Sequence, residues 1–168
     1  ASHVGMSVSK LLSRIVLPSA TKRKELNFGN SSGSVTLHDQ LHDYSYGITS
    51  DPLTQFACFF TALIHDCDHH GVSNQRLVDE EHPLVNTFGE RSVAEQHSID
   101  MAWQHLMSTK FQNFRNLLMP DLDTAKRFRQ LIVNGVMATD IMDKGLKESR
   151  NQRWAQAFAK DVTETVDE

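Results

Sequence analysis

Cysteine is scarce in this chain: Cys58 and Cys67 are the only two among 168 residues, and no C-x-x-C spacing links them. A disulfide-stabilised secreted domain is therefore not expected, and both thiols should be reduced, as in a cytosolic protein. No apolar run approaches the roughly 20 residues of a transmembrane helix. The first residues, Ala1 to Val4, lack the charged and apolar segments of a signal peptide. These absences predict a cytoplasmic chain, or the cytoplasmic part of a larger membrane protein.

Alternating strand patterns are nearly absent, and neither internal repeats nor low-complexity segments occur. The net charge of −4 argues against a nucleic-acid-binding surface. With 39% hydrophobic and 23% charged residues, the composition is that of a soluble globular protein long enough for one domain with a core. The nine histidines are the one unusual number. We expect an all-α domain and look for a role for the histidines.

Helical spacing of apolar residues covers most of the chain. It predicts helices over residues 4–17, 51–64, 92–106, 122–145 and about 146–160, with short helical turns over 74–87 that Pro83 interrupts. Asp51-Pro52 has the form of a helix start, and Asp121 or Asp123 could cap the helix over 122–145. Ser92-Val93-Ala94-Glu95 resembles a capping box. The helix over 122–145 is expected to present Phe128 and Ile141 on one face.

Residues 18–50 are expected to form a long surface loop, because basic and Gly/Ser/Asn-rich stretches follow one another there. The histidine–aspartate pairs at 38–39 and 42–43 fall in this loop and are interpreted as surface pairs, with a metal site as the weaker alternative. Residues 161–168 form an acidic tail that we expect to fray. On this interpretation the whole of 1–168 belongs to a single domain.

The segment from His65 to Asn74 is the most informative part of the chain: it reads HDCDHHGVSN and follows an apolar run. Burying two histidines and two carboxylates within five residues is costly unless something compensates, and a divalent metal ion is the obvious candidate. Gly71 predicts a turn close by. Asp66 has two oxygens and could bridge two metal ions, which is a suitable arrangement for phosphoester hydrolysis. The simpler alternative is that the His-Asp pair, taken alone, is a helix cap or a surface pair.

The longer string HDCDHHGVSNQRL resembles the signature of class I 3′,5′-cyclic-nucleotide phosphodiesterases, within the HD superfamily of metal phosphohydrolases. The resemblance continues through residues 90–97, which are similar to the family's E-S-V-L-E-N-H segment, and through 128–140, which resemble its helix ending in A-T-D. Local details look most similar to the phosphodiesterase domains of algal and protist cyclase-linked proteins. The resemblance implies a multi-helix HD-type phosphodiesterase catalytic domain, of which this chain is the N-terminal and middle portion.

The resemblance also implies roles for individual residues. His65 and Asp66 match metal ligands, and Asp66 would touch both ions of a two-metal site that holds Zn²⁺ and Mg²⁺ or Mn²⁺. His69 matches a histidine near the substrate phosphate, and Glu95 matches a glutamate that orients metal-bound waters. These four residues are the expected catalytic and metal-binding groups.

Three further matches lie on the expected substrate pocket. Asn74 matches a structural asparagine of the signature, and Thr139 and Asp140 match residues of the pocket wall. The substrate implied is a cyclic nucleotide, cAMP or cGMP, which would be hydrolysed to a 5′-nucleotide. No nucleic acid is expected as a partner, and no segment of this chain is expected to enter a membrane.

Other parts of the family pattern have no counterpart here. The family's Y-H-N-x-x-H-A segment supplies a general-acid histidine and a metal-binding histidine, and a third metal aspartate comes from a later segment. Ala1 to Val4 fit the residues that directly follow the first of these segments. We therefore expect the isolated chain to bind metal weakly and to turn over little or no substrate. A truncated, non-catalytic fragment or interaction module is the alternative.

The remaining histidines and Trp103 have simpler interpretations. His97 and His105 are expected to be core or surface histidines rather than ligands, although the resemblance puts His97 near the site. His70 stands where the family commonly has proline, which indicates a looser turn. Trp103 is expected in the core, and some apolar helix faces are expected to be exposed.

Overall fold

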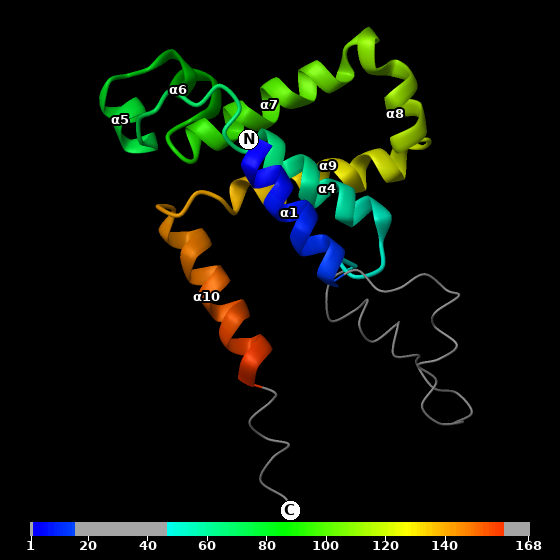
Figure 1. Ribbon diagram of the computed structural model, residues 1–168. Coiled ribbons are helices and arrows are strands. Elements are labelled where there is room, and N and C mark those ends of the chain that lie inside the picture. Colours follow the sequence, from blue (N-terminus) through cyan, green and yellow to red (C-terminus); the bar gives the residue numbers. More distant parts are fainter. Residues whose placement is uncertain (1, 16–46, 160–168) are drawn as a thin grey trace, which may run out of the picture.

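The computed structural model describes residues 2–15 and 47–159, which form helices and no strands (Figure 1). The expected loop over 18–50 and the tail over 161–168 therefore lie almost entirely outside the described residues. In chain order the helices are α1 (Ser2–Ile15), α4 (Pro52–Ile64), α5 (Asn74–Asp79), α6 (Pro83–Phe88), α7 (Val93–Met107), the 3₁₀ helix η2 (Thr109–Phe111), α8 (Gln112–Leu118), α9 (Leu122–Met137) and α10 (Lys144–Ala159). The expectation of an all-α chain is confirmed for these residues.

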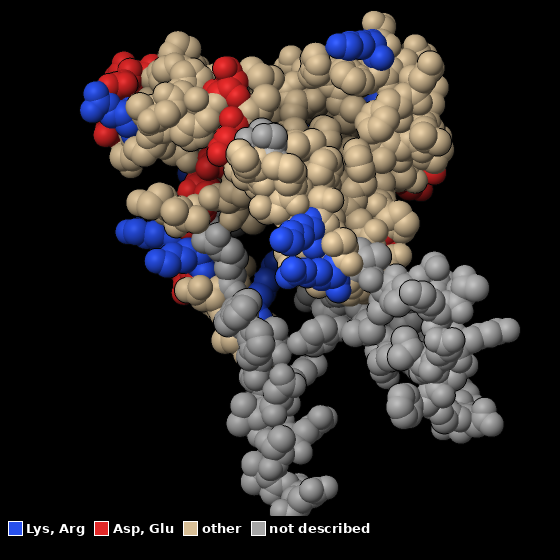
Figure 2. Space-filling view, in the orientation of Figure 1, with Lys and Arg blue, Asp and Glu red and all other residues tan. Residues whose placement is uncertain are grey.

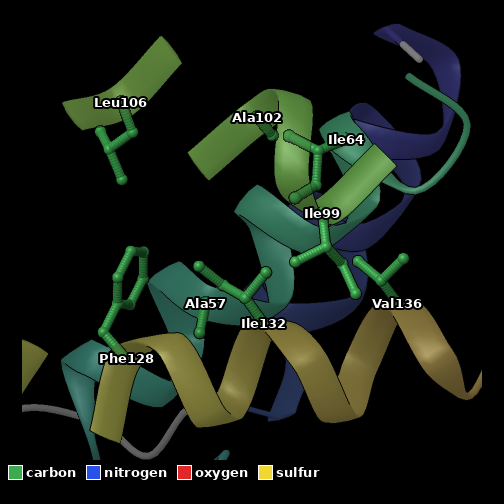
Figure 3. Close-up of a cluster of buried hydrophobic side chains, with 8 residues drawn as sticks. All are labelled: Ala57, Ile64, Ile99, Ala102, Leu106, Phe128, Ile132 and Val136. Atoms are coloured by element: carbon green, nitrogen blue, oxygen red, sulfur yellow. The ribbon is translucent and has the colours of Figure 1, made fainter. Parts of the chain in front are cut away.

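The core lies where α4, α7 and α9 meet (Figure 3). Helix α9 contributes Phe128, Ile132 and Val136, each at most 1% exposed. The facing residues are Ala57 and Ile64 from α4, and Ile99, Ala102 and Leu106 from α7. These positions are three, four or seven residues apart along each helix, which is the spacing that buries one stripe of a helix. The packing of α4 against α9 fixes the position of the C-terminal end of α4.

Glycine at position 135 permits this close packing. A Cβ atom at Gly135 would lie 2.9 Å from both Oγ1 and Cγ2 of Thr61 on α4. Any larger residue would push α4 and α9 apart, so the two helices approach each other through this position.

The start of α4 confirms the sequence prediction. Asp51 is the N-cap, and its carboxylate accepts hydrogen bonds from the amides of Leu53 and Thr54 at 3.2 Å each. Pro52 occupies the first helical position, where its missing N–H costs nothing. The short helices α5 and α6 also match the predicted turns over 74–87, and Pro83 begins α6.

The capping box predicted at Ser92 is wrong. Ser92 does precede α7, but its backbone is left-handed, with φ 48° and ψ 44°, and its side chain makes no cap hydrogen bond. Its hydroxyl instead donates to Oδ2 of Asp140 at 2.7 Å. An N-cap serine normally has an extended backbone, so the left-handed conformation of Ser92 accounts for the missing cap, and its hydroxyl instead donates to a distant carboxylate.

The single helix predicted over 122–145 is also wrong. Helix α9 ends at Met137, and α10 begins at Lys144. Between them, Oδ1 of Asp140 accepts hydrogen bonds from the amides of Met142 and Asp143 at 2.9 and 3.1 Å, which turns the backbone out of the helix. Ile141, predicted on the buried face, is 70% exposed.

Several large apolar side chains are exposed, as expected. Helix α1 packs on α4 and leaves Met6 60% and Leu11 57% exposed, while Leu117 and Met142 are 83% and 77% exposed. Trp103 is partly buried against the core, and the guanidinium of Arg129 lies 5.5 Å from its ring centre. None of the described helices is long and apolar enough to cross a membrane.

Candidate functional site

The signature segment forms the turn that ends α4. The amide of Cys67 donates to the Ile64 carbonyl at 2.8 Å, and the amide of His69 donates to the Asp66 carbonyl at 3.3 Å. Gly71, with φ 75°, then reverses the chain in a conformation that glycine adopts readily. The expected bend at this end of the helix is present, and because of it the side chains of His65 and His69 contact different partners.

Two contacts hold this turn against α7. The hydroxyl of Ser98, which is fully buried, donates to the Cys67 carbonyl at 2.8 Å. Nε2 of His97 lies 3.0 Å from Oδ2 of Asp68. The hydrogen bond from His97 lowers the pKa of the Asp68 carboxyl below its usual 3.8. Asp68 and His97 therefore pair with each other and connect the turn to α7.

His65 and Asp66 form a pair whose geometry fits a cation. Nδ1 of His65 lies 3.1 Å from the Ala62 carbonyl oxygen, a contact that requires the ring proton on Nδ1. Nε2 lies 3.1 Å from Oδ2 of Asp66. With a proton on Nε2 as well, the two side chains form an ion pair, and a metal ion bound to Nε2 and to the carboxylate could take the place of that proton. Imidazole with its second nitrogen bonded to a carbonyl is also the usual form of a metal-ligating histidine.

The pair is not a complete metal site by itself. Within the described residues, no group of three or more histidine, cysteine, aspartate or glutamate side chains is arranged to hold a metal ion. His69, four residues after His65, does not join the pair: its Nδ1 accepts a hydrogen bond from the amide of Gly71 at 2.9 Å. His65 and Asp66 could thus supply two ligands, and the remaining ligands would have to come from elsewhere.

Five of the seven predicted site residues line one cavity of about 660 Å³: His69, Asn74, Glu95, Thr139 and Asp140. They come from four separate segments, namely the turn after α4, the start of α5, the first turn of α7 and the connection between α9 and α10. His65 and Asp66 do not line this cavity. The structure therefore groups the five predicted catalytic and pocket residues, while His65 and Asp66 lie earlier in the turn after α4 and outside the cavity lining.

Asn74 connects these segments. Its Nδ2 donates to Oε2 of Glu95 at 2.9 Å and to Oδ2 of Asp140 at 3.3 Å, while its Oδ1 accepts from the amide of Ala94 at 2.9 Å. One side chain thus uses both ends of its amide to join the start of α5 to α7 and to the segment after α9. Thr139, at the edge of the cavity, donates its hydroxyl to the Val136 carbonyl at 2.6 Å.

Ser92, Arg91 and Asp143 are residues of this cavity that sequence reasoning missed. Ser92 donates to Asp140, and the guanidinium of Arg91 donates to Oδ2 of Asp143 at 2.7 and 3.2 Å. The hydrogen bond to Asp143 raises the pKa of Arg91 above its ordinary value, so the guanidinium stays charged. No local pattern could reveal these contacts, because they join residues about fifty positions apart.

Carboxylates outnumber fixed cations around the cavity. Its lining includes the acids Glu90, Glu95, Asp140 and Asp143, against Arg91 and Lys144. Acidic side chains also gather on the α5 and α6 side of the visible face (Figure 2). An anion would be repelled from such a cavity unless bound cations compensated for the carboxylates.

The other histidines have structural surroundings. The ring of His70 lies edge-on to that of His82, with centroids 4.8 Å apart, and Nδ1 of His82 accepts from the amide of Leu84 at 3.3 Å. His105 is exposed, and its ring centroid lies 5.2 Å from that of Phe111. These rings pack the turn and the helix ends together.

Comparison with known proteins assigns the chain to a family. Residues 35–165 match the family model described as 3′5′-cyclic nucleotide phosphodiesterase. The chain is 35% identical over 102 residues, 59% of its length, to the cGMP-inhibited 3′,5′-cyclic phosphodiesterase 3A of Homo sapiens. It is 34% identical over 91 residues to the 3′,5′-cyclic-AMP phosphodiesterase 4C of Mus musculus and 30% identical over 89 residues to the probable 3′,5′-cyclic-AMP phosphodiesterase pde-4 of Caenorhabditis elegans; each of these two matches covers 53% of the chain.

The matches cover only a small part of these relatives: 9% of the human protein, 12% of the mouse protein and 13% of the nematode protein. The expectation of a partial class I phosphodiesterase domain is confirmed by the family match and by these partial alignments. The helical architecture agrees with the helical fold of that domain. The chain belongs to the 3′5′-cyclic nucleotide phosphodiesterase family.

Proposed function

We propose that the complete domain containing this chain hydrolyses cAMP, cGMP or both to 5′-nucleotides, and that residues 1–168 are the N-terminal and middle portion of that catalytic domain. One observation carries the proposal. His69, Asn74, Glu95, Thr139 and Asp140 come from four segments and line one cavity of about 660 Å³, which is a suitable volume for a small organic ligand.

His65 and Asp66 would hold divalent metal ions beside this cavity, with Zn²⁺ in one position and Mg²⁺ or Mn²⁺ in the other. The support is that Nε2 of His65 and Oδ2 of Asp66 lie 3.1 Å apart, close enough for one cation to contact both, while Nδ1 of His65 is within hydrogen-bonding distance of a carbonyl. Bound metal ions would supply Lewis-acid stabilisation of the phosphoryl oxygens. They would also compensate for the carboxylates of the cavity, which otherwise disfavour an anionic substrate.

His69 is suited to contact a phosphate oxygen. Because its Nδ1 accepts the hydrogen bond from Gly71, the proton of the neutral ring is on Nε2. An exposed Nε2–H at the edge of the cavity is a hydrogen-bond donor for a phosphoryl group. Glu95 is held from the other side, since Asn74 donates to its Oε2, and it would orient water near the metal ions.

Asn74, Thr139 and Asp140 would shape the substrate pocket. Asn74 and Asp140 use most of their hydrogen-bonding capacity within the protein, so they would act chiefly by fixing the cavity wall. Thr139 is exposed at the edge of the cavity and is the best placed of the three to meet a ligand directly. The domain would act in the cytoplasm or on the cytoplasmic face of a membrane protein.

The test is the Asp66→Ala variant of the full-length protein, assayed for hydrolysis of cAMP and of cGMP. Loss of a ligand shared by two metal ions is expected to lower kcat/KM at least about a hundredfold. Asp123→Ala is the matched control, because Asp123 has a side chain that is 97% exposed on α9, away from the cavity. Activity retained in Asp66→Ala would refute the proposal.

A non-catalytic fragment or interaction module is the alternative, and the exposed apolar side chains favour it. Leu117, Leu122 and Met142 are each more than two-thirds exposed, which is typical of a surface that another chain covers. Assaying the full-length protein beside the 168-residue chain, both with Zn²⁺ and Mn²⁺, separates the two functions. We expect weak metal binding and little turnover from the isolated chain, whereas the full-length protein should be active only if the enzymatic proposal holds.

A further inference from the structure

Ser92 is in an unusual position for a serine. It directly precedes α7, is 2% exposed, and has a left-handed backbone with φ 48° and ψ 44°. A residue with a Cβ atom adopts this conformation at a cost, so surrounding contacts must enforce it. The contact on its side chain is the hydrogen bond of 2.7 Å from its hydroxyl to Oδ2 of Asp140.

Asp140 gathers four donors around one buried carboxylate. Oδ2 accepts from the Ser92 hydroxyl and from Nδ2 of Asn74, and Oδ1 accepts from the amides of Met142 and Asp143. Asp140 is 5% exposed, so each of these bonds replaces one that water would otherwise supply. The carboxylate thus ties the segment after α9 to the starts of α5 and α7.

The same bonds reach the cavity. Asn74, which donates to Asp140, also donates to Glu95, and all three residues line the cavity. Ser92 fixes the carboxylate plane of Asp140, which in turn fixes the turn over 140–143 and the position of the Asn74 amide. A change at Ser92 would therefore alter both the turn over 140–143 and the position of the Asn74 amide, which are parts of the cavity lining.

We propose that Ser92 is a positioning residue for the nucleotide-binding cavity, acting through Asp140 on Asn74, Glu95 and the turn over 140–143. This proposal rests on the proposed function for the identity of the ligand, and on the hydrogen bonds alone for the positioning. The hydroxyl, rather than the backbone conformation, is the part of Ser92 that performs this role.

Three variants of the 168-residue chain test it: Ser92→Ala, Ser92→Gly and, as the matched control, Ser108→Ala. The hydroxyl of Ser108 is buried, follows α7 and has no hydrogen-bond partner in the described part of the chain, so its removal should change little. Both Ser92 variants lack the hydroxyl, but only glycine relieves the left-handed backbone. The two can therefore separate positioning from backbone strain.

The first measurement is amide hydrogen exchange by NMR. In both Ser92 variants we expect the amides of Met142 and Asp143 to exchange at least about tenfold faster, because the carboxylate that accepts their hydrogen bonds loses a donor. The amides of Phe128 and Ile132 in the core of α9 should keep their protection, as should all four amides in Ser108→Ala. If Ser92→Gly restores wild-type protection at Met142 and Asp143, the serine matters only through its backbone and the proposal is overturned.

The second measurement is binding of AMP and GMP, in the presence of Mn²⁺, to the full-length protein and to the same three variants of it, by isothermal titration calorimetry. Both Ser92 variants should bind about tenfold more weakly than the wild type, and Ser108→Ala should match the wild type. Equal affinity in all four proteins would overturn the positioning role. A full-length wild type that binds neither nucleotide would count against the proposed function, while the exchange measurement would still decide the role of Ser92.

Discussion

Asp51 and Asp66 lie at opposite ends of α4, and their carboxylates have opposite surroundings. Asp51 accepts hydrogen bonds from the amides of Leu53 and Thr54, from the Thr54 hydroxyl and from the guanidinium of Arg127, and its side chain is 14% exposed. Asp66 is 67% exposed, and its carboxylate lies 3.1 Å from Nε2 of His65.

The difference shows that a carboxylate at one end of a helix can stabilise the fold while a carboxylate at the other end stays available for a ligand. A carboxylate surrounded by protein donors stabilises the fold and has little capacity left for a ligand. A carboxylate that is largely exposed and has one imidazole beside it contributes little to the fold and is available to a cation. We therefore expect substitutions at the two ends of α4 to have different effects on stability and on metal binding.

The largest effect on stability is expected for Asp51→Ala. The substitution removes the N-cap of α4 and leaves Arg127 without its partner, so the free energy of unfolding should fall by about 2 kcal/mol. Urea denaturation followed by circular dichroism measures it. Asp121→Ala is the comparison, since Asp121 caps α9 through the amide of Thr124 without an arginine partner among the described residues, and its loss should be smaller. Equal losses would show that Arg127 adds nothing.

A smaller effect is expected from acidification. Partial burial raises the pKa of the Asp51 carboxyl, but hydrogen bonds from the Thr54 hydroxyl and the Leu53 amide, together with Arg127, outweigh it, so the pKa lies below 3.8. The unfolded chain therefore takes up this proton more readily than the folded chain. The stabilisation is complete above pH 3.8 and is lost as the pH falls through the lowered pKa of the folded state.

Asp51→Asn isolates this contribution, because asparagine can still cap a helix but carries no charge. The wild type should be more stable than the variant at pH 7, and the difference should shrink at about pH 2.5. Urea denaturation of both proteins at the two pH values measures the change. A difference that stays constant with pH would mean that the charge of Asp51 is not what stabilises the start of α4.

Much of the helical fold could be predicted from the sequence, because apolar spacing and proline positions are local signals. The bounds of α4 and the turns of α5 and α6 followed from Pro52, Pro83 and the apolar residues between them. The helix over 122–145 was predicted too long because Ile141 continues the apolar spacing. The backbone amides after Asp140 donate hydrogen bonds to its carboxylate instead of continuing the helix, and apolar spacing cannot reveal these bonds.

The candidate site likewise has features that local sequence patterns predict and features that depend on long-range contacts. The five residues that the family signature singled out, His69, Asn74, Glu95, Thr139 and Asp140, line one cavity, and their roles stay predictions. The sequence predicts a helix cap at Ser92, because a serine three residues before a glutamate has the form of a capping box. Its true partner, Asp140, is 48 residues away, and only the packing of α7 and α9 brings the two together.

The smallest effect on stability, and the most selective one, is expected at the other end of α4. Without metal, Asp66→Ala should change the free energy of unfolding by less than about 0.5 kcal/mol, because the side chain is largely exposed. With Mn²⁺ at about ten times its dissociation constant, the wild type should gain about 1.4 kcal/mol, and the variant should gain nothing. Thermal denaturation with and without Mn²⁺ measures both quantities. Asp68→Ala lies in the same turn but removes the partner of His97, so it should keep the response to Mn²⁺. If Asp68→Ala lost the response while Asp66→Ala kept it, the cation would bind at the α7 side of the turn, and the end of α4 would be structural at Asp66 as it is at Asp51.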